Sequence, residues 1–161
     1  MKTFLRTTAL AAVLALPLAA NAAETPVSEI SVKADLTAIG NATAAAVWQN
    51  LPADLERELA VQLADQITED GAEVMIDINK LELATAFEEV TDLANSTMSG
   101  DVVIERPGAD YDQAYSLTVS AEQAAVLLPA GTDIALLAPG STEFYNAMVA
   151  AFASNVVEKM K

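Results

Sequence analysis

The chain has 161 residues, of which 23 are acidic, eight are basic and none is histidine or cysteine. The absence of histidine and cysteine excludes Ser-His-Asp and Cys-His catalysis, disulfide bonds and most zinc and copper sites. A formal net charge of −15 disfavours nucleic acid and anionic lipid as partners, because both are negatively charged. The acidic surface either serves solubility or favours a basic partner.

Residues 1–22 have the three parts of an export signal. A basic start precedes an apolar run that is too short to cross a bilayer, and Ala20-Asn21-Ala22 matches the small-x-small cleavage rule. No cysteine follows, which excludes a lipid anchor of the lipoprotein type. We therefore expect a soluble, exported, periplasmic protein in which residues 23–161 form a single domain. That domain keeps six basic and 23 acidic residues, a net charge of −17.

The first elements of this domain are a strand and a divided helix. Alternating apolar and polar residues over 29–36 predict a half-buried strand. The Ala-rich segment 42–50 predicts a helix, and Pro52 should divide it from the next one, because proline removes an N–H and crowds the preceding turn. Trp48 has two interpretations, an anchor between helix and sheet or a surface for ligand stacking.

An apolar stripe with a spacing of four residues predicts a long amphipathic helix after Pro52. Its members are Leu55, Leu59, Leu63 and Ile67. We expect Gly71 to end this helix, because glycine takes positive φ at little cost. Period-two alternation over 74–78 then predicts a strand. From Leu81 onward the apolar residues fall at odd-numbered instead of even-numbered positions. This change favours a β-bulge near residues 79–80, although a strand buried on both faces would give a similar pattern.

The segment 84–100 has weaker signals: its apolar residues Phe87, Val90 and Leu93 fit a short helix, and residues 95–100 are typical of a loop. A β-hairpin follows, with strands at 102–106 and 111–119.

The end of the chain is predicted to be mainly helical. Ser120 and Gln123 have capping-box spacing, which indicates a short helix, and residues 133–137 fit a short strand. A final helix is expected over 142–159. Its buried stripe again has a spacing of four residues and comprises Phe144, Met148, Phe152, Val156 and Met160.

The order of elements predicts an α+β fold with a mixed sheet of about four strands and two long helices on one face. In element order this resembles the small β-α-β-β domains of bacterial envelope proteins, such as the amino-terminal domain of TolB and some lipoproteins near transport complexes. The resemblance implies adaptor or assembly roles in the envelope, and it transfers no site residue.

The hairpin tip is the candidate binding site. Arg106, Asp110, Tyr111 and Asp112 flank one turn and are not obviously needed by the core. Tyrosine and arginine are favoured binding anchors, and the two aspartates suit a basic patch on a partner. Turns also collect such residues for backbone reasons alone.

The sequence contains no motif that carries catalytic chemistry. Asp110-x-Asp112 begins like a calcium loop but does not continue as one, and the remaining carboxylates are scattered, so we expect no metal and no cofactor. We therefore predict a non-catalytic module that binds another envelope protein. The alternatives are a small-ligand carrier with a helix–sheet cleft and a carboxylate-dependent hydrolase.

Overall fold

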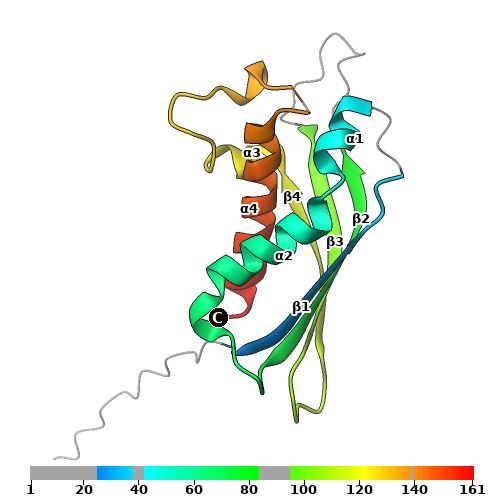
Figure 1. Cartoon of the computed structure of the whole chain (residues 1–161), viewed down its shortest axis with the longest axis vertical. Helices are drawn as coiled ribbons and strands as arrows, with labels where there is room; N and C mark the ends of the chain where they lie inside the picture. Colours follow the sequence, from blue (N-terminus) through cyan, green and yellow to red (C-terminus); the bar gives the residue numbers. More distant parts are fainter. Residues whose placement is uncertain (1–24, 38–41, 84–94, 139) are drawn as a thin grey trace, which may run out of the picture.

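The computed structural model describes residues 25–37, 42–83, 95–138 and 140–161 (Figure 1). The export signal predicted at 1–22 and the short helix predicted from Phe87, Val90 and Leu93 lie outside these residues. The strands are β1 (Val27–Ala34), β2 (Ala72–Glu82), β3 (Thr97–Glu105) and β4 (Gln113–Ser120). The α-helices are α1 (Ala42–Trp48), α2 (Leu51–Gln62), α3 (Ala121–Ala125) and α4 (Thr142–Lys159).

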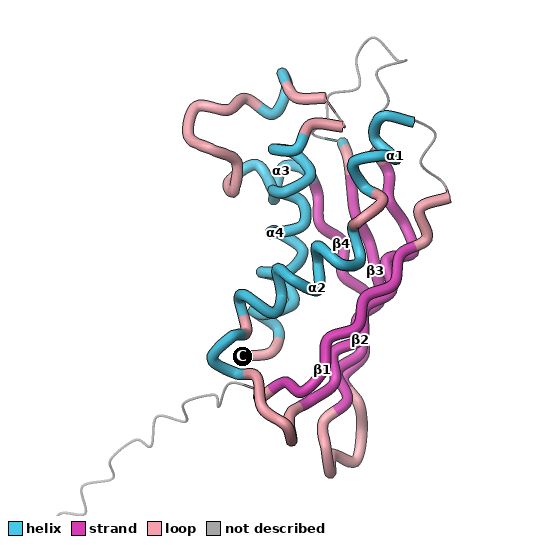
Figure 2. The backbone as a smooth tube through the Cα atoms, in the orientation of Figure 1, coloured by secondary structure: helices cyan, strands magenta, loops and turns pink. Residues whose placement is uncertain are grey.

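The fold is α+β, as predicted. The strands form one mixed sheet in the order β1-β2-β3-β4, in which β1 and β2 are parallel and the later pairs are antiparallel. A parallel pair needs a crossover connection, and the segment with α1 and α2 supplies it. Figure 2 shows α2 and α4 crossing the same face of the sheet, and no helix of the described residues lies on the other face.

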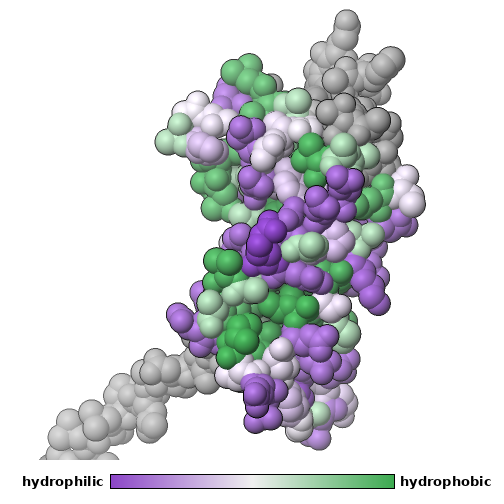
Figure 3. Space-filling view, in the orientation of Figure 1, coloured by the Kyte–Doolittle hydropathy of each residue, from purple (hydrophilic) through white to green (hydrophobic). Residues whose placement is uncertain are grey.

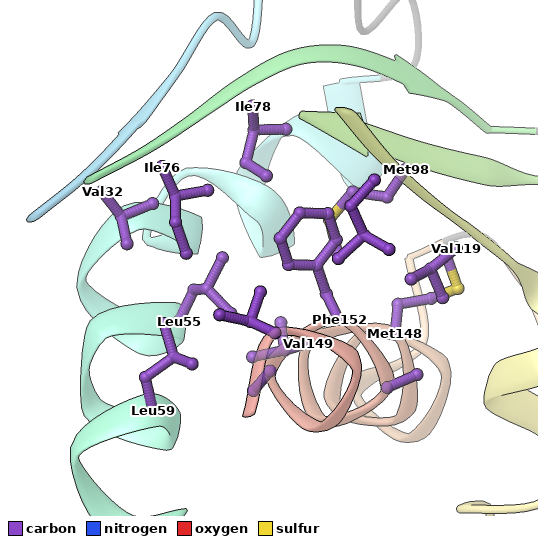
Figure 4. Packing of buried hydrophobic residues seen from close by; sticks show 14 of the residues in the cluster. Val32, Leu55, Leu59, Ile76, Ile78, Met98, Val119, Met148, Val149 and Phe152 are labelled. Carbon is purple, nitrogen blue, oxygen red and sulfur yellow. The ribbon is translucent and has the colours of Figure 1, made fainter. Parts of the chain in front are cut away.

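Both long helices bury the larger part of their predicted stripes against the sheet, but the last member of the first stripe is wrong: Ile67 lies beyond the end of α2 at Gln62 and is 48% exposed. Figure 4 shows Phe152 of α4 between the strands and the helices, with Leu55 and Leu59 of α2 beside it. Trp48 is fully buried, and its ring makes edge contacts with Phe144 and Tyr145 at centroid distances of 6.3 and 5.0 Å. Trp48 thus anchors the end of α1 to the start of α4, and the ligand-stacking interpretation of its ring is wrong.

Helix α4 matches its predicted bounds at both ends. The Ser141 hydroxyl accepts a hydrogen bond from the backbone N–H of Phe144, as expected of an N-cap, and Lys159 lies in the last turn, where the helix dipole favours positive charge. All five residues of its predicted stripe are buried. The capping box of Ser120 and Gln123 is also present and starts α3.

The predicted role of Gly71 as a helix end with positive φ is wrong. Helix α2 ends at Gln62, a short 3₁₀ turn follows at Ala64–Gln66, and the positive-φ glycines of the described chain are Gly108 and Gly131. A Cβ atom on Gly71 would lie 2.3 Å from the carbonyl carbon of Val27. Glycine is therefore needed here because two backbone segments pass in close contact.

Strand boundaries differ from the prediction: the strand predicted at 29–36 is β1, Val27–Ala34, and the strand predicted to begin at residue 111 begins at Gln113. The predicted bulge is confirmed by the register shift between Ile78 and Lys80. Strand β3 begins at Thr97, so the loop predicted at 95–100 is wrong, because pairing with β2 and β4 holds these polar residues in the sheet. The short strand predicted at 133–137 is a 3₁₀ turn, Ile134–Leu136.

We predict that Leu63→Ala lowers the free energy of unfolding by about 2–5 kcal/mol, because Leu63 is fully buried and the change leaves a cavity. Val61→Ala, at a side chain that is 67% exposed two residues earlier, should change it by less than about 0.5 kcal/mol. Urea unfolding of both variants measures this. Equal effects would show that the buried face of the helix is misassigned.

Candidate functional site

The face of the sheet opposite the helices is the candidate functional surface, and we call it the open face. Side chains alternate between the two faces of a strand, so each buried core residue of the sheet has neighbours that point outward. The outward residues at the centre of the sheet are half-buried or exposed. They are Ser31 and Lys33 on β1, Met75 and Asp77 on β2, Asp101 and Val103 on β3, and Ala114, Ser116 and Thr118 on β4.

Two pairs of carboxylates face each other across β2 and β3 on this surface. The register places Glu73 opposite Glu105 and Asp77 opposite Asp101, and all four side chains are exposed. Like charges directly opposite one another in a sheet are destabilising, so folding does not account for this arrangement.

Between the two carboxylate pairs lies an apolar pair. The register places Met75 opposite Val103, and both side chains are half-buried. They line a shallow hollow of about 220 Å³ together with Ser31, Lys33, Ile76, Asp77 and Asp101. The open face therefore has an apolar centre with negative charge at either end along the strands.

The two central aspartates differ in their surroundings. Asp101 accepts hydrogen bonds from Asn79 Nδ2 at 2.7 Å and from Ser116 Oγ at 2.6 Å, one on each carboxylate oxygen. Within the described residues, the Asp77 carboxylate has no hydrogen bond and no ion pair shorter than 4.0 Å, although Lys33 lies opposite it on β1. Asp77 is thus held on a rigid strand with its charge available to a partner.

The predicted hairpin site lies at one end of the open face. Figure 1 shows the β3–β4 turn projecting at the bottom of the view, beyond the ends of the paired strands. Asp110, Tyr111 and Asp112 are all exposed there, and Tyr111 is 88% exposed. The turn follows Glu105, so its aspartates extend the negative charge of the neighbouring carboxylate pair.

Arg106 does not share this exposure. Its guanidinium donates hydrogen bonds to Gln113 Oε1 at 3.0 Å and to Thr25 Oγ1 at 3.4 Å. Thr25 Oγ1 in turn donates to the backbone carbonyl of Met160 at 2.8 Å. Arg106 therefore joins the base of the hairpin to the start of β1 and the end of α4.

A second concave region lies on the helical side, between α2, α4 and residues 127–129. This cleft of about 480 Å³ is lined on its polar side by Asp54, Arg57, Glu143 and Tyr145. Tyr145 donates a hydrogen bond to Asp54 Oδ2 at 2.6 Å, and Arg57 forms an ion pair with the same carboxylate. Figure 3 shows hydrophobic surface on the segment that follows α3, where Val126 is 82% exposed. Core side chains pack between the helices and the sheet (Figure 4), where the alternative of a small-ligand carrier would have its cleft.

Neither surface brings together the groups of a metal centre. Across residues 25–37, 42–83, 95–138 and 140–161, no three Asp or Glu side chains gather closely enough to hold a metal ion. No helix in these ranges is long and apolar enough to cross a membrane.

Comparisons with known proteins leave the family open. No protein-family model matches the chain, and no curated protein matches it. One solved structure, described as the crystal structure of an uncharacterized protein, is similar over 86% of this chain and 93% of its own. The TM-score is 0.49 and the sequence identity is 12%, so this similarity carries no functional argument.

The sequence did not single out the carboxylate pairs of the open face. Alternation along β2 shows that Glu73, Met75 and Asp77 share one face. It does not reveal the strand lying opposite, because that partner is 24–32 residues away in the chain and its register depends on the bulge and on β3 beginning at Thr97.

Tyr145 generates a prediction about pH. Burial and the hydrogen bond to the Asp54 carboxylate raise the pKa of Tyr145 above the ordinary value of 10. Its contribution to stability is therefore complete below pH 10 and is lost as the pH rises from there toward the raised pKa of the folded state. We expect Tyr145→Phe to lower the melting temperature at neutral pH, by a difference that shrinks above pH 10.

Thermal melts of both proteins across the alkaline range measure this difference. Tyr111→Phe is the control, because the exposed ring of Tyr111 should not affect the melting temperature at neutral pH. A difference that stays constant into the alkaline range would contradict the assignment to Tyr145.

Proposed function

We propose that this chain is an exported, non-catalytic module that binds another protein through the open face and the adjoining hairpin tip. The observation that carries the proposal is the arrangement on β2 and β3, where the carboxylate pairs Glu73–Glu105 and Asp77–Asp101 flank the apolar pair Met75–Val103. An apolar centre with a charged rim is the usual anatomy of a protein–protein interface.

The geometry specifies the chemistry of the partner. Glu73 and Asp77 are four residues apart on one strand, which corresponds to about 13 Å. The partner should present basic side chains about that distance apart with an apolar side chain between them. An extended segment with basic residues at positions i and i+4 and an apolar residue at i+2 meets this requirement, because alternate side chains of a strand lie on one face.

Charge at the hairpin tip adds to this recognition. Asp110 and Asp112 are exposed beside the Glu73–Glu105 pair, and Glu29 lies opposite Glu73 on β1. Exposed charges of one sign accelerate encounter with a basic partner at low salt and are screened as salt increases. Tyr111 supplies rigid contact area at the end of the same surface.

A small-ligand carrier is the alternative, and the specific observation in its favour is the cleft between α2 and α4. The polar wall of that cleft is already engaged, since Tyr145 and Arg57 both bind Asp54. On the open face Asp101 is hydrogen-bonded, whereas Asp77 makes no hydrogen bond or ion pair within the described residues, and we therefore prefer protein binding.

Export is tested separately from binding. The basic start, the short apolar run and Ala20-Asn21-Ala22 predict a mature protein that begins at Ala23. Intact-mass measurement of protein from the periplasm should give the mass of residues 23–161. Retention of residues 1–22 would contradict the periplasmic localisation.

Binding is tested with a photoactivatable residue at Val103, in the centre of the open face, and with the same residue at exposed Val61 on the helical side. In periplasmic extract we expect the photoactivatable residue at position 103 to crosslink a specific protein that the one at position 61 does not.

The double change Glu73→Gln, Glu105→Gln should then weaken binding of that protein roughly tenfold at low salt, because rim charges drive encounter. It should leave the melting temperature unchanged or higher, because it removes a repulsive pair.

The matched control is Glu69→Gln, Glu158→Gln, which makes the same change in net charge at exposed residues away from the centre of the open face. Equal loss of binding in both double variants would show that the effect comes from the change in net charge and not from the position of the carboxylates. Specific crosslinking from position 61 alone would contradict binding at the open face and would indicate a site on the helical side.

A further inference from the structure

Among the residues that the structure describes, no strand pairs with the outer edge of β4, in contrast to the edge formed by β1. On β1, the backbone N–H of Val32 donates to the Glu56 carboxylate of α2 at 2.9 Å. The start of β1 is covered as well, since the Val27 carbonyl accepts a hydrogen bond from the Thr68 N–H at 2.8 Å. One edge of the sheet is therefore occupied by the chain itself.

Pairing geometry identifies the backbone groups that β4 leaves free. The N–H of Ala121 donates to the Ser96 carbonyl at 2.9 Å, which continues the β3–β4 register and marks a hydrogen-bonded pair. Such pairs alternate in an antiparallel ladder, so the odd-numbered residues of β4 bond to β3. The N–H and C=O groups of Ala114, Ser116 and Thr118 therefore point to the free edge. Within the described residues they make no backbone hydrogen bond outside the sheet.

The composition of β4 leaves this edge suited to pairing. Its sequence, QAYSLTVS, contains no charged residue, no proline and no glycine, in a chain with 23 acidic residues. Natural sheets protect their edges with lysine, proline, bulges or covering segments. The β3–β4 register runs without a shift, and no bulge interrupts the strand.

We propose that β4 pairs antiparallel with β4 of a second copy of this chain, with Ser116 on the two-fold axis. This register sets Ala114 opposite Thr118 of the second copy, and it satisfies the free N–H and C=O groups of all three residues at once. On the helical side it sets Tyr115 opposite Leu117 of the second copy, so the facing residues of the two β4 strands carry no like charges.

The charge distribution favours a second copy over an acidic or basic partner at this edge. Two chains with large negative charge repel each other overall, and an uncharged strand lets them meet without placing carboxylates in contact. A basic partner would gain nothing from this strand and has the open face available instead. The two-fold axis is perpendicular to the sheet, so the two open faces lie on the same side of one continuous eight-stranded sheet.

The absence of cysteine from the chain allows a direct test of the register. Opposed residues of a hydrogen-bonded antiparallel pair have Cα atoms about 5.5 Å apart, within the range of about 4.4–6.8 Å that a disulfide requires. In the mature protein, Ser116→Cys should form a disulfide-linked dimer under mild oxidation. Gln49→Cys, at an exposed position near α1, is the control and should form far less.

Two further variants test the pairing in detail. Ala114→Cys alone should not crosslink, whereas a mixture of Ala114→Cys and Thr118→Cys chains should form the mixed dimer. Ser116→Pro, made in the natural sequence without any added cysteine, removes an N–H that points to the free edge. We expect analytical ultracentrifugation to show that this variant no longer forms the dimer. Circular dichroism should show that its fold is retained.

Salt distinguishes this interface from the open face. Dimerisation should strengthen as salt rises, because screening reduces repulsion between the copies, whereas binding of the basic partner should weaken. A monomer at every protein and salt concentration would overturn the proposal. So would equal crosslinking of Ser116→Cys and Gln49→Cys, or a dimer that survives in Ser116→Pro with its fold retained.

Discussion

The burial of one sheet face by α2 and α4 is the constraint on which the other features depend. The chain has no disulfide to hold it together, so the two apolar stripes must find a common surface. Trp48, Phe144 and Tyr145 lock the helices to each other where the crossover and the last helix meet. Because both helices occupy the same face, the opposite face is not covered by any helix of the described residues.

Elements with strong local signals could be predicted from sequence. Helix α4 carries a serine cap, a stripe with a spacing of four and a terminal lysine, and these act within one segment. The bulge between Ile78 and Lys80 was visible as a change of apolar parity, because alternation reports directly which face a side chain occupies. The two-helix layer follows, since each stripe must be buried.

Features that depend on distant segments could not be predicted. Gly71 resembles a helix end in sequence, yet its glycine is needed because the backbone of Val27 passes within contact distance. Thr97 belongs to β3 because both of its neighbouring strands pair with it, which outweighs its loop-like surroundings. The open face is a further case. Glu105 can be recognised as part of a carboxylate pair only when the strand register is known, because the register sets it opposite Glu73.

Solubility alone does not explain where the carboxylates of the sheet lie. Negative charge serves solubility at any exposed position, whereas opposed carboxylates such as Asp77 and Asp101 reduce the stability of the sheet. The same sheet ends in β4, an edge strand without charge. A surface selected only to repel other molecules would have placed charge on that edge, where unwanted pairing begins. Carboxylates opposed on the open face and absent from β4 are consistent with the two interfaces that we propose, one for a basic partner and one for a second copy of the chain.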